Sequence, residues 1–575
     1  MSSPRSRRRL AGALVPCVLA VLVGSCRKDA AGPGSDPGSA PAGPAATSAP
    51  GGRVHLLIAY GSEKKTWFEE QVAAFLATAP RVDGLPLEIE TRAMGSGESV
   101  QAVERGELQP HVVSPASGAY ITLLNDAWAK RSGKSKDLAP PGEPLVLSPL
   151  VIALWRPMAV ALGWPKAKLG WKELLAVARD PKGWGKYGHP EWGAFKLGHT
   201  HPELSNSGLL AVLAAAYAGA DKTRGLTVAD LGSKPVRALI GAVEKSIVHY
   251  GKSTGFFADR MLARGPGYLS AAVLYENLIV EASARPNPPE MPVVAIYPRE
   301  GTFWCDHPYS ILDAPWVGAA ERKGAEALLA FLRARPAQER ALALGFRPGD
   351  PAVPIGAPID AEHGVDAKQP QTLLEVPDGA TLRALLEAWR EHKRAADVIM
   401  VFDKSGSMSG APLTQAKKGA RGFLDRLSDK DDVTLTFFDG VVYPPIGPYR
   451  LGEKKPELLA RIDDAFAGGG TALYDAVDAA YSQLSQRAKA DPGRIHALVV
   501  MTDGKDESSA VINLESLKQK VKAEGDQPVR VFAIAYGKGA SEAVLHDIAE
   551  SAQGMSAKGT TSTIVQVYDE MAAFF

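Results

Sequence analysis

Short apolar segments alternate with amphipathic ones from residue 53 onward. Residues 54–59 form an apolar run, and the segment after it places Phe68, Val72 and Phe75 on one face, as in a helix packed on a core. Residues 87–90 alternate between apolar and polar side chains, which is typical of a half-buried strand. Strands that alternate with helices predict an α/β fold with mainly parallel strands.

The same pattern returns between residue 395 and the end of the chain. Residues 398–402 are wholly apolar, as expected of a buried parallel strand. Further strands are expected at 433–438, 497–501 and 529–535, with helices between them. Doubly wound sheets of this kind bind ligands at the carboxyl ends of their strands, so the loops there are the candidate sites.

Composition excludes several classes of protein. A chain of 575 residues implies several domains, and a net charge of +1 argues against nucleic-acid binding through overall basicity. Three cysteines exclude a disulfide scaffold, and a mean hydropathy of −0.08 excludes a multi-span membrane protein. Of the three, Cys305 is expected to be a buried free thiol.

The first residues have the pattern of an export signal. Four arginines between residues 5 and 9 precede an apolar stretch at 10–23, and small residues then lead to Cys26. This arrangement resembles the lipobox of bacterial lipoproteins, which implies that residues 1–25 are removed and that Cys26 carries a lipid. Residues 26–52 are mostly Gly, Pro, Ala and Ser, which predicts a disordered tether.

Three turns place serine and glycine at expected helix starts, at Ser62, Ser96 and Ser207. The first backbone N–H groups of a helix are unpaired and its dipole is positive there, so converging helix starts can hold an anion. The alternative is that these serines only cap their helices.

Residues 95–97, 111–117, 198–208 and 274–277 resemble segments of bacterial extracellular solute-binding proteins of the molybdate, sulfate and phosphate type. The resemblance implies that residues 53–350 form two α/β lobes that close on a ligand. It assigns the ligand contacts to Ser62, Ser96, Gly97, Ser117, Thr200, Ser207 and Tyr275.

Residues 351–394 are expected to connect two folded parts. The first part of this segment is rich in Pro, Gly and Asp and is interpreted as surface loop. Leu382, Leu385, Leu386 and Trp389 then follow helical spacing, which predicts an amphipathic helix that packs on a neighbouring domain.

Oxygen-bearing side chains follow the expected strands of the C-terminal region. They are Asp403, Ser405, Ser407, Thr471 and Asp503. Two carboxylates with hydroxyls and water suit a hard cation such as Mg²⁺. An EF-hand loop that starts at Asp403 would need an acidic residue where Thr414 stands, so that alternative fails.

Residues 403–407 are also similar to the phosphorylated loop of cation-pumping ATPases. That class needs a bundle of membrane helices, which the sequence lacks, and the related soluble phosphatases need an acid where Ser405 stands. We therefore expect no enzymatic role.

The order Asp-x-Ser-x-Ser, Thr, Asp resembles the metal-ion-dependent adhesion site of von Willebrand factor A domains. The resemblance implies a Rossmann-like domain over residues 395–575. It also implies that Ser405, Ser407 and Thr471 contact Mg²⁺ directly, while Asp403 and Asp503 act through water. A low protein charge leaves the ion able to bind the carboxylate of a protein partner.

The sequence predicts a lipid-anchored protein of the bacterial cell envelope that faces the periplasm or the exterior. It would bind a protein partner through Mg²⁺, with a second domain that senses a small anionic solute. One alternative is a receptor for an ABC-type transport system with an accessory adhesion module. Another is a scaffold whose cleft binds nothing.

Overall fold

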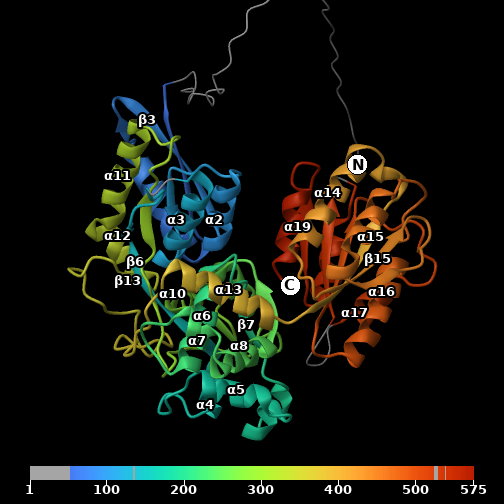
Figure 1. The fold of residues 1–575 in the computed structure, drawn as a ribbon, viewed down its shortest axis with the longest axis horizontal. Helices are drawn as coiled ribbons and strands as arrows, with labels where there is room; N and C mark the ends of the chain where they lie inside the picture. The colour runs from blue at the N-terminus through green and yellow to red at the C-terminus, as the bar shows by residue number, and fades with distance from the viewer. Residues whose placement is uncertain (1–51, 134–135, 523–528, 538) are drawn as a thin grey trace, which may run out of the picture. The chain divides into compact units, whose positions relative to one another are not determined.

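The computed structural model describes residues 52–133, 136–522, 529–537 and 539–575 (Figure 1). The predicted signal segment, the predicted lipidation site Cys26 and nearly all of the predicted tether lie outside these residues. Among the described helices, none combines the length and the apolar character needed to cross a bilayer. Cys305 is buried and forms no disulfide, as expected.

The first lobe is built on a sheet with the strand order β2-β3-β1-β4-β12-β5. Its central strand β1 pairs in parallel with β3 and β4, while β12 returns antiparallel. Leu56, Ile58 and Trp67 are fully buried between this sheet and its helices. The strands are β1 (Val54–Gly61), β2 (Arg81–Val82), β3 (Leu85–Met94), β4 (Val112–Ser114), β5 (Glu143–Pro144) and β12 (Pro308–Ile311), and the helices are α1 (Lys65–Ala77), α2 (Ser96–Arg105), α3 (Gly118–Ser132), α11 (Ala319–Arg333) and α12 (Arg335–Ala343).

The second lobe has a sheet with the order β10-β6-β9-β7-β8. The expectation of mainly parallel strands is wrong here, because β6 pairs antiparallel with β9 and with β10. Strand β6 follows β5 of the first lobe by one residue and crosses into the second sheet, where it runs opposite to β9 and β10. The strands are β6 (Val146–Trp155), β7 (Leu197–Thr200), β8 (Ile247–Gly251), β9 (Ala271–Tyr275) and β10 (Val293–Ile296), with β11 (Trp304–Cys305) and β13 (Arg347–Pro348) also paired to β6.

Helices cover this second sheet, and the most buried is α6 (Asn206–Ala220), which has thirteen residues shielded from solvent. A helix that is apolar on every side can form only inside a core, so α6 lies at the centre of the lobe. The other helices are α4 (Arg156–Ala161), α5 (Trp171–Arg179), α7 (Val228–Leu231), α8 (Lys234–Ser246), α9 (Thr254–Arg264) and α10 (Glu276–Ser283). The predicted bilobal α/β fold is confirmed.

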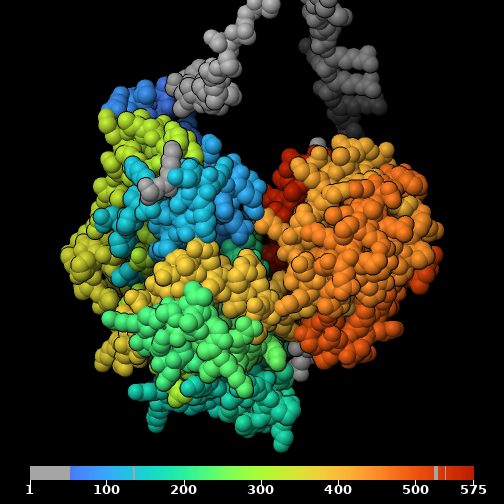
Figure 2. Space-filling model, viewed as in Figure 1, coloured from blue at the N-terminus to red at the C-terminus, as the bar shows by residue number. Residues whose placement is uncertain are grey.

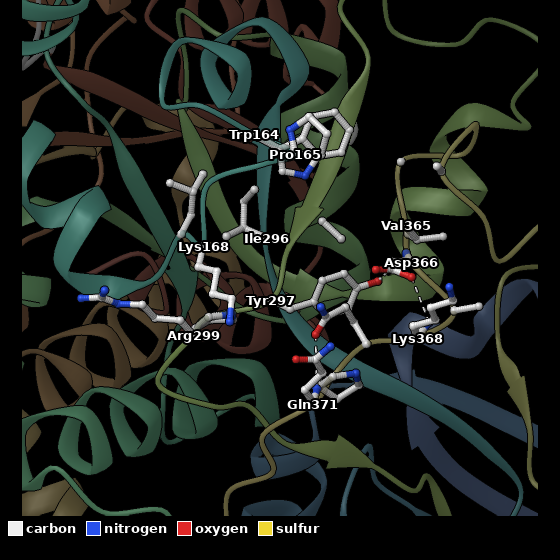
Figure 3. A pocket seen from close by; sticks show the side chains of 18 of the residues that line it. Trp164, Pro165, Lys168, Ile296, Tyr297, Arg299, Val365, Asp366, Lys368 and Gln371 are labelled. Carbon is white, nitrogen blue, oxygen red and sulfur yellow. Dashed lines mark hydrogen bonds between the residues drawn. The ribbon is translucent and has the colours of Figure 1, made fainter.

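Residues 351–378 have no helix or strand, yet backbone hydrogen bonds fasten them to the second lobe. The N–H of Ala295 donates to the carbonyl of Gly364 at 2.8 Å, and the N–H of Leu374 donates to that of Thr302 at 2.8 Å. A pocket of about 540 Å³ lies where this segment crosses the lobe, with Trp164 and Tyr297 in its lining (Figure 3).

Helix α13 (Gly379–His392) follows this segment and is the predicted amphipathic helix. Asp378 caps its first turn, since the carboxylate accepts from the N–H of Thr381 at 2.7 Å. Trp389 is buried and donates to Glu244 of the second lobe at 3.1 Å, and Arg383 pairs with Asp126 of the first. In Figure 2 the gold surface of this helix lies between the blue and green surfaces of the two lobes.

The C-terminal region forms a third sheet with the order β16-β15-β14-β17-β18-β19. All pairs are parallel except β15 with β16, which confirms the doubly wound fold. The strands are β14 (Ala396–Asp403), β15 (Asp432–Phe438), β16 (Ile446–Arg450), β17 (Ile495–Thr502), β18 (Arg530–Tyr536) and β19 (Met555–Gly559), and the helices are α14 (Ala411–Arg426), α15 (Leu451–Asp463), α16 (Leu473–Ala490), α17 (Leu514–Val521), α18 (Glu542–Ser551) and α19 (Ile564–Ala572).

Candidate functional site

Two neighbouring strands end at the candidate metal centre. Strands β14 and β17 are parallel, and Phe402 pairs with Met501 in their register. Asp403 ends β14, and Asp503 follows the last residue of β17. The parallel register therefore places the two carboxylates at the same edge of the sheet.

The predicted oxygen donors come together at this edge. The hydroxyl of Ser407 donates to Asp503 Oδ1 at 2.7 Å, and the hydroxyl oxygens of Ser405 and Ser407 are 3.2 Å apart. Thr471 lies two residues before the start of α16, and a Cβ added at Gly504 would lie 3.1 Å from its hydroxyl oxygen. All five predicted residues thus belong to one cluster.

Asp403 is oriented by groups within its own surroundings. Its Oδ1 accepts from the N–H of Ser405 at 2.7 Å, and its Oδ2 accepts from the hydroxyl of Thr502. Sequence reasoning missed Thr502, although its place directly before Asp503 at a strand end was a usable signal. These two hydrogen bonds fix the orientation of the Asp403 carboxylate.

The electrostatics of the cluster fit a cation. Burial raises the pKa of Asp403, and the charge of Asp503 raises it further. Burial also raises the pKa of Asp503, against the hydrogen bond from Ser407. Both pKa values are raised because burial disfavours a negative charge, and a divalent cation would offset that cost.

The chemistry of the donors also favours a hard cation. Among the described residues, no three His, Cys, Asp or Glu side chains gather as a metal site, and this cluster has two carboxylates with hydroxyls as its other donors. Lys404, although it stands between Asp403 and Ser405, pairs with Asp439 at 2.5 Å. Oxygen donors of this kind suit Mg²⁺ or a similar hard cation.

The residues predicted to contact a solute lie where the two lobes meet. The hydroxyl of Ser117 in the first lobe donates to Asn206 Oδ1 in the second at 2.6 Å. Ser62 Oγ accepts from the N–H of Gly255 at 3.2 Å, which is another bond between the lobes. Gly97 lies so close to the second lobe that an added Cβ would be 2.1 Å from the carbonyl oxygen of Glu203.

The remaining predicted contacts are also engaged in protein hydrogen bonds. Ser96 Oγ accepts from the N–H of Ala116 at 3.1 Å, and the hydroxyl oxygens of Thr200 and Ser207 are 2.8 Å apart. Tyr275 accepts from the side-chain amide of Asn206 at 2.9 Å. Each of these bonds lies within one lobe, and a solute that binds these groups would have to replace them.

Asn206 is the residue that sequence reasoning missed in this cleft. It bonds to Ser117 and to Tyr275, so it joins the two lobes at their centre. Its position at the first residue of α6, directly before the predicted contact Ser207, was the available signal. The pocket in Figure 3 is a separate feature, and none of the seven predicted solute contacts is among the described residues that line it.

A buried charged group stands beside the cleft. Lys64 Nζ donates to Glu63 Oε1 at 3.1 Å and to the carbonyl of Ser114 at 2.8 Å. Burial opposes the charge on Glu63, but Lys64 and then His307 lower its pKa to about 2. The side-chain amide of Asn277 donates to the carbonyl of Glu63 at 3.1 Å, which ties this group to the second lobe.

Comparisons with known proteins find matches in both parts of the chain. A Synechocystis protein described as uncharacterized is 30% identical over 158 residues, which cover 28% of this chain and 36% of that relative. The chain therefore spans about a third of that relative's length.

Two solved structures match different parts of the chain. A periplasmic thiamin-binding protein is 14% identical, covers 59% of this chain and 96% of its own, and gives a TM-score of 0.42. A mussel byssus protein, proximal thread matrix protein 1 with a zinc-occupied MIDAS motif, is 21% identical, covers 31% and 47%, and gives a TM-score of 0.27.

Family models match the two parts separately. The model for the von Willebrand factor type A domain matches residues 397–570, which hold the whole candidate metal centre. The model for bacterial extracellular solute-binding proteins matches residues 56–347, which is half of the chain and both lobes. The chain thus belongs to the bacterial extracellular solute-binding protein family and carries a von Willebrand factor type A domain after the solute-binding-like part.

Proposed function

We propose that this protein recognises a protein partner through a divalent cation, with Mg²⁺ as the natural ion. Asp403, Ser405, Ser407, Thr471 and Asp503 would hold the ion. The observation that carries the proposal is that two buried carboxylates with raised pKa values share one cluster with serine and threonine hydroxyls. The bound ion would supply an electrophilic centre for a partner's Asp or Glu. The proposed role is recognition and not catalysis.

The protein's own residues would set the geometry of recognition. The N–H of Ser405 and the hydroxyl of Thr502 hold Asp403, while Ser407 holds Asp503. Because these bonds are already formed, few side chains would have to be ordered when the ion and the partner bind.

The test of the metal proposal is thermal unfolding of the full chain with and without Mg²⁺. An ion at a hundredfold excess over its Kd stabilises the folded state by about 2.7 kcal/mol, so the unfolding temperature of the C-terminal part is expected to rise. Asp403→Ala should remove this increase and all Mg²⁺-dependent partner capture. Asp464→Ala, at an exposed carboxylate after α15, is the control and should respond as the wild type does. An unchanged Mg²⁺ response in Asp403→Ala would exclude the proposed centre.

We also propose that the protein is anchored in the cell envelope through lipid on Cys26. The support is the lipobox pattern before this cysteine and the family match to extracellular solute-binding proteins. Cell fractionation tests it, since Cys26→Ala should move the protein from the membrane to the soluble fraction. Retention of this variant in the membrane fraction would exclude the anchor.

A second candidate function is binding of a small anionic solute between the lobes, as a sensor or as a transport receptor. The favouring observation is that hydroxyl and amide groups of both lobes converge in the cleft. Calorimetric titration of the folded protein with sulfate, phosphate and small dicarboxylates tests it. Absence of binding heat would favour a scaffold whose cleft is closed on itself.

A further inference from the structure

Large apolar side chains face solvent on the loops around the candidate metal centre. Val511 is 81% exposed, Phe466 77%, Val441 58% and Tyr443 37%. Among the described residues of 395–575, no other large apolar side chain is as exposed as these four. Exposed apolar residues that gather in one place mark an interaction surface, whereas single ones are common on any protein. We call these four residues the apolar rim.

Two rings of the apolar rim are held against the metal loop itself. The ammonium of Lys404, between Asp403 and Ser405, lies 4.2 Å from the ring centroid of Tyr443 and 5.6 Å from that of Phe466. The Tyr443 hydroxyl donates to Asp439 Oδ2 at 2.8 Å, and Lys404 pairs with the same carboxylate. Cation–π contacts and this ion pair therefore fix both rings beside the candidate ion.

The backbone adds further attachments. The N–H of Gly468 donates to the carbonyl of Lys404 at 2.9 Å, and the N–H of Gly406 donates to that of Gly469 at 3.0 Å. These bonds join the loop that carries Phe466 to the loop that carries the serine donors. Phe466 is consequently exposed but positioned, which lowers the entropy cost of using it in binding.

The valines of the apolar rim are positioned in the same way. The N–H of Val441 donates to Asp439 Oδ1 at 3.1 Å, so Val441 stands beside the Lys404 pair. The N–H of Val511 donates to Asp475 Oδ1 at 3.0 Å, and Asp475 lies in the first turn of α16, which follows Thr471. The apolar rim thus draws on three loops that all connect to the metal donors.

The charges around the apolar rim decide what kind of partner it fits. Asp439 neutralises Lys404. The proposed cation is therefore the positive charge that remains for a partner's carboxylate. We infer that this surface binds an exposed protein segment in which Asp or Glu directly neighbours a large apolar or aromatic side chain. The carboxylate would reach the ion, and the apolar neighbour would pack on Phe466 and Tyr443. This inference rests on the proposed metal-dependent recognition and adds the side chain that accompanies the carboxylate.

The test uses a random peptide library displayed on phage and panned on the full chain in Mg²⁺, with elution by EDTA. Selected peptides are expected to pair an acidic residue with a neighbouring Phe, Trp, Leu or Ile. Phe466→Ser should weaken binding of a synthetic selected peptide by about tenfold, since aromatic anchors carry a large share of binding energy. Val228→Ser, at a 52% exposed valine of α7, is the matched control and should leave binding unchanged.

The outcomes separate this inference from the function on which it rests. Selection of acidic peptides without apolar neighbours, with binding indifferent to Phe466→Ser, would overturn the apolar rim and leave Mg²⁺-dependent recognition in place. Absence of any Mg²⁺-dependent peptide, with a folded protein that binds Mg²⁺ in calorimetry, would overturn both. Phe466→Ser should still fold and bind Mg²⁺ in calorimetry, because Phe466 supplies none of the proposed oxygen donors.

Discussion

At the scale of single residues, burial decides what each polar side chain does. The Asp403 carboxylate has a raised pKa because it is buried near Asp503, whereas Lys64 lowers that of Glu63. The residue types of the metal centre were predictable, since the spacing Asp-x-Ser-x-Ser places oxygen donors on one loop. Lys404 was not assigned a partner, because Asp439 lies 35 residues further along the chain, directly after β15.

His201 provides a residue-scale prediction of pH dependence. The histidine is buried against Trp389, with ring centroids 4.8 Å apart, and its Nδ1 accepts from the N–H of Glu203 at 3.3 Å. Burial, followed by the charge of Lys393, lowers its pKa well below the ordinary value of 6.5. The unfolded chain therefore binds the proton first as the pH falls, and the free energy of unfolding decreases below about pH 6.5.

His201→Asn should reduce this sensitivity to acid. Asparagine keeps an acceptor for the Glu203 N–H but does not titrate, so the fall in unfolding temperature between about pH 7.5 and 5.5 should be smaller than in the wild type. His189→Asn, which removes a histidine from the surface, is the control and should fall as the wild type does. An identical pH dependence in His201→Asn would contradict the assignment.

At the scale of elements, the strongest patterns were the most predictable. All eight residues of β14 are buried, because Val398, Met400 and Phe402 face one core and Ile399 and Val401 the other. A run that is apolar on both faces has no other stable place in a soluble fold. The helix α13 was also predictable from its spacing, since Trp389 and two of its leucines form one buried stripe.

The segment 351–378 has long-range contacts that a local sequence pattern does not predict. Its composition indicated a surface loop, but Val353, Ile359, Val365 and Leu374 are buried and its backbone bonds to the second lobe. The partners, such as Ala295 and Thr302, lie far back in the sequence, and no local period reports such contacts. Whether this segment is a boundary between domains stays a prediction.

At the scale of the whole molecule, the direct contact between the lobes is the main result. The N–H of Glu98 donates to the carbonyl of Leu204 at 3.0 Å, and Tyr120 donates to that of Pro202 at 2.7 Å. With the Ser117–Asn206 bond, these contacts join the two lobes directly. A solute role therefore requires an open form in which these groups are released.

Gly97→Ala tests this closed contact. Alanine is the better helix former within α2, yet its Cβ would meet the Glu203 carbonyl oxygen at 2.1 Å. The lobes should separate or strain, with a larger radius of gyration in solution scattering and a loss of about 1–3 kcal/mol in urea unfolding. Gly267→Ala, which would meet no atom within 4 Å, is the control. Wild-type size and stability in Gly97→Ala would show that the lobes do not meet there.

The sequence by itself determined the α/β class and the family resemblances, and it predicted the oxygen donors of the candidate metal centre. Those features are local, since periodicity, a strand end and the spacing of Asp403, Ser405 and Ser407 lie within a few residues. Tertiary structure decided which distant groups pair. It joined Ser117 to Asn206 across the lobes, and placed Phe466 and Tyr443 on Lys404. Long-range contacts depend on how the chain folds back on itself, and no local pattern of residues records them.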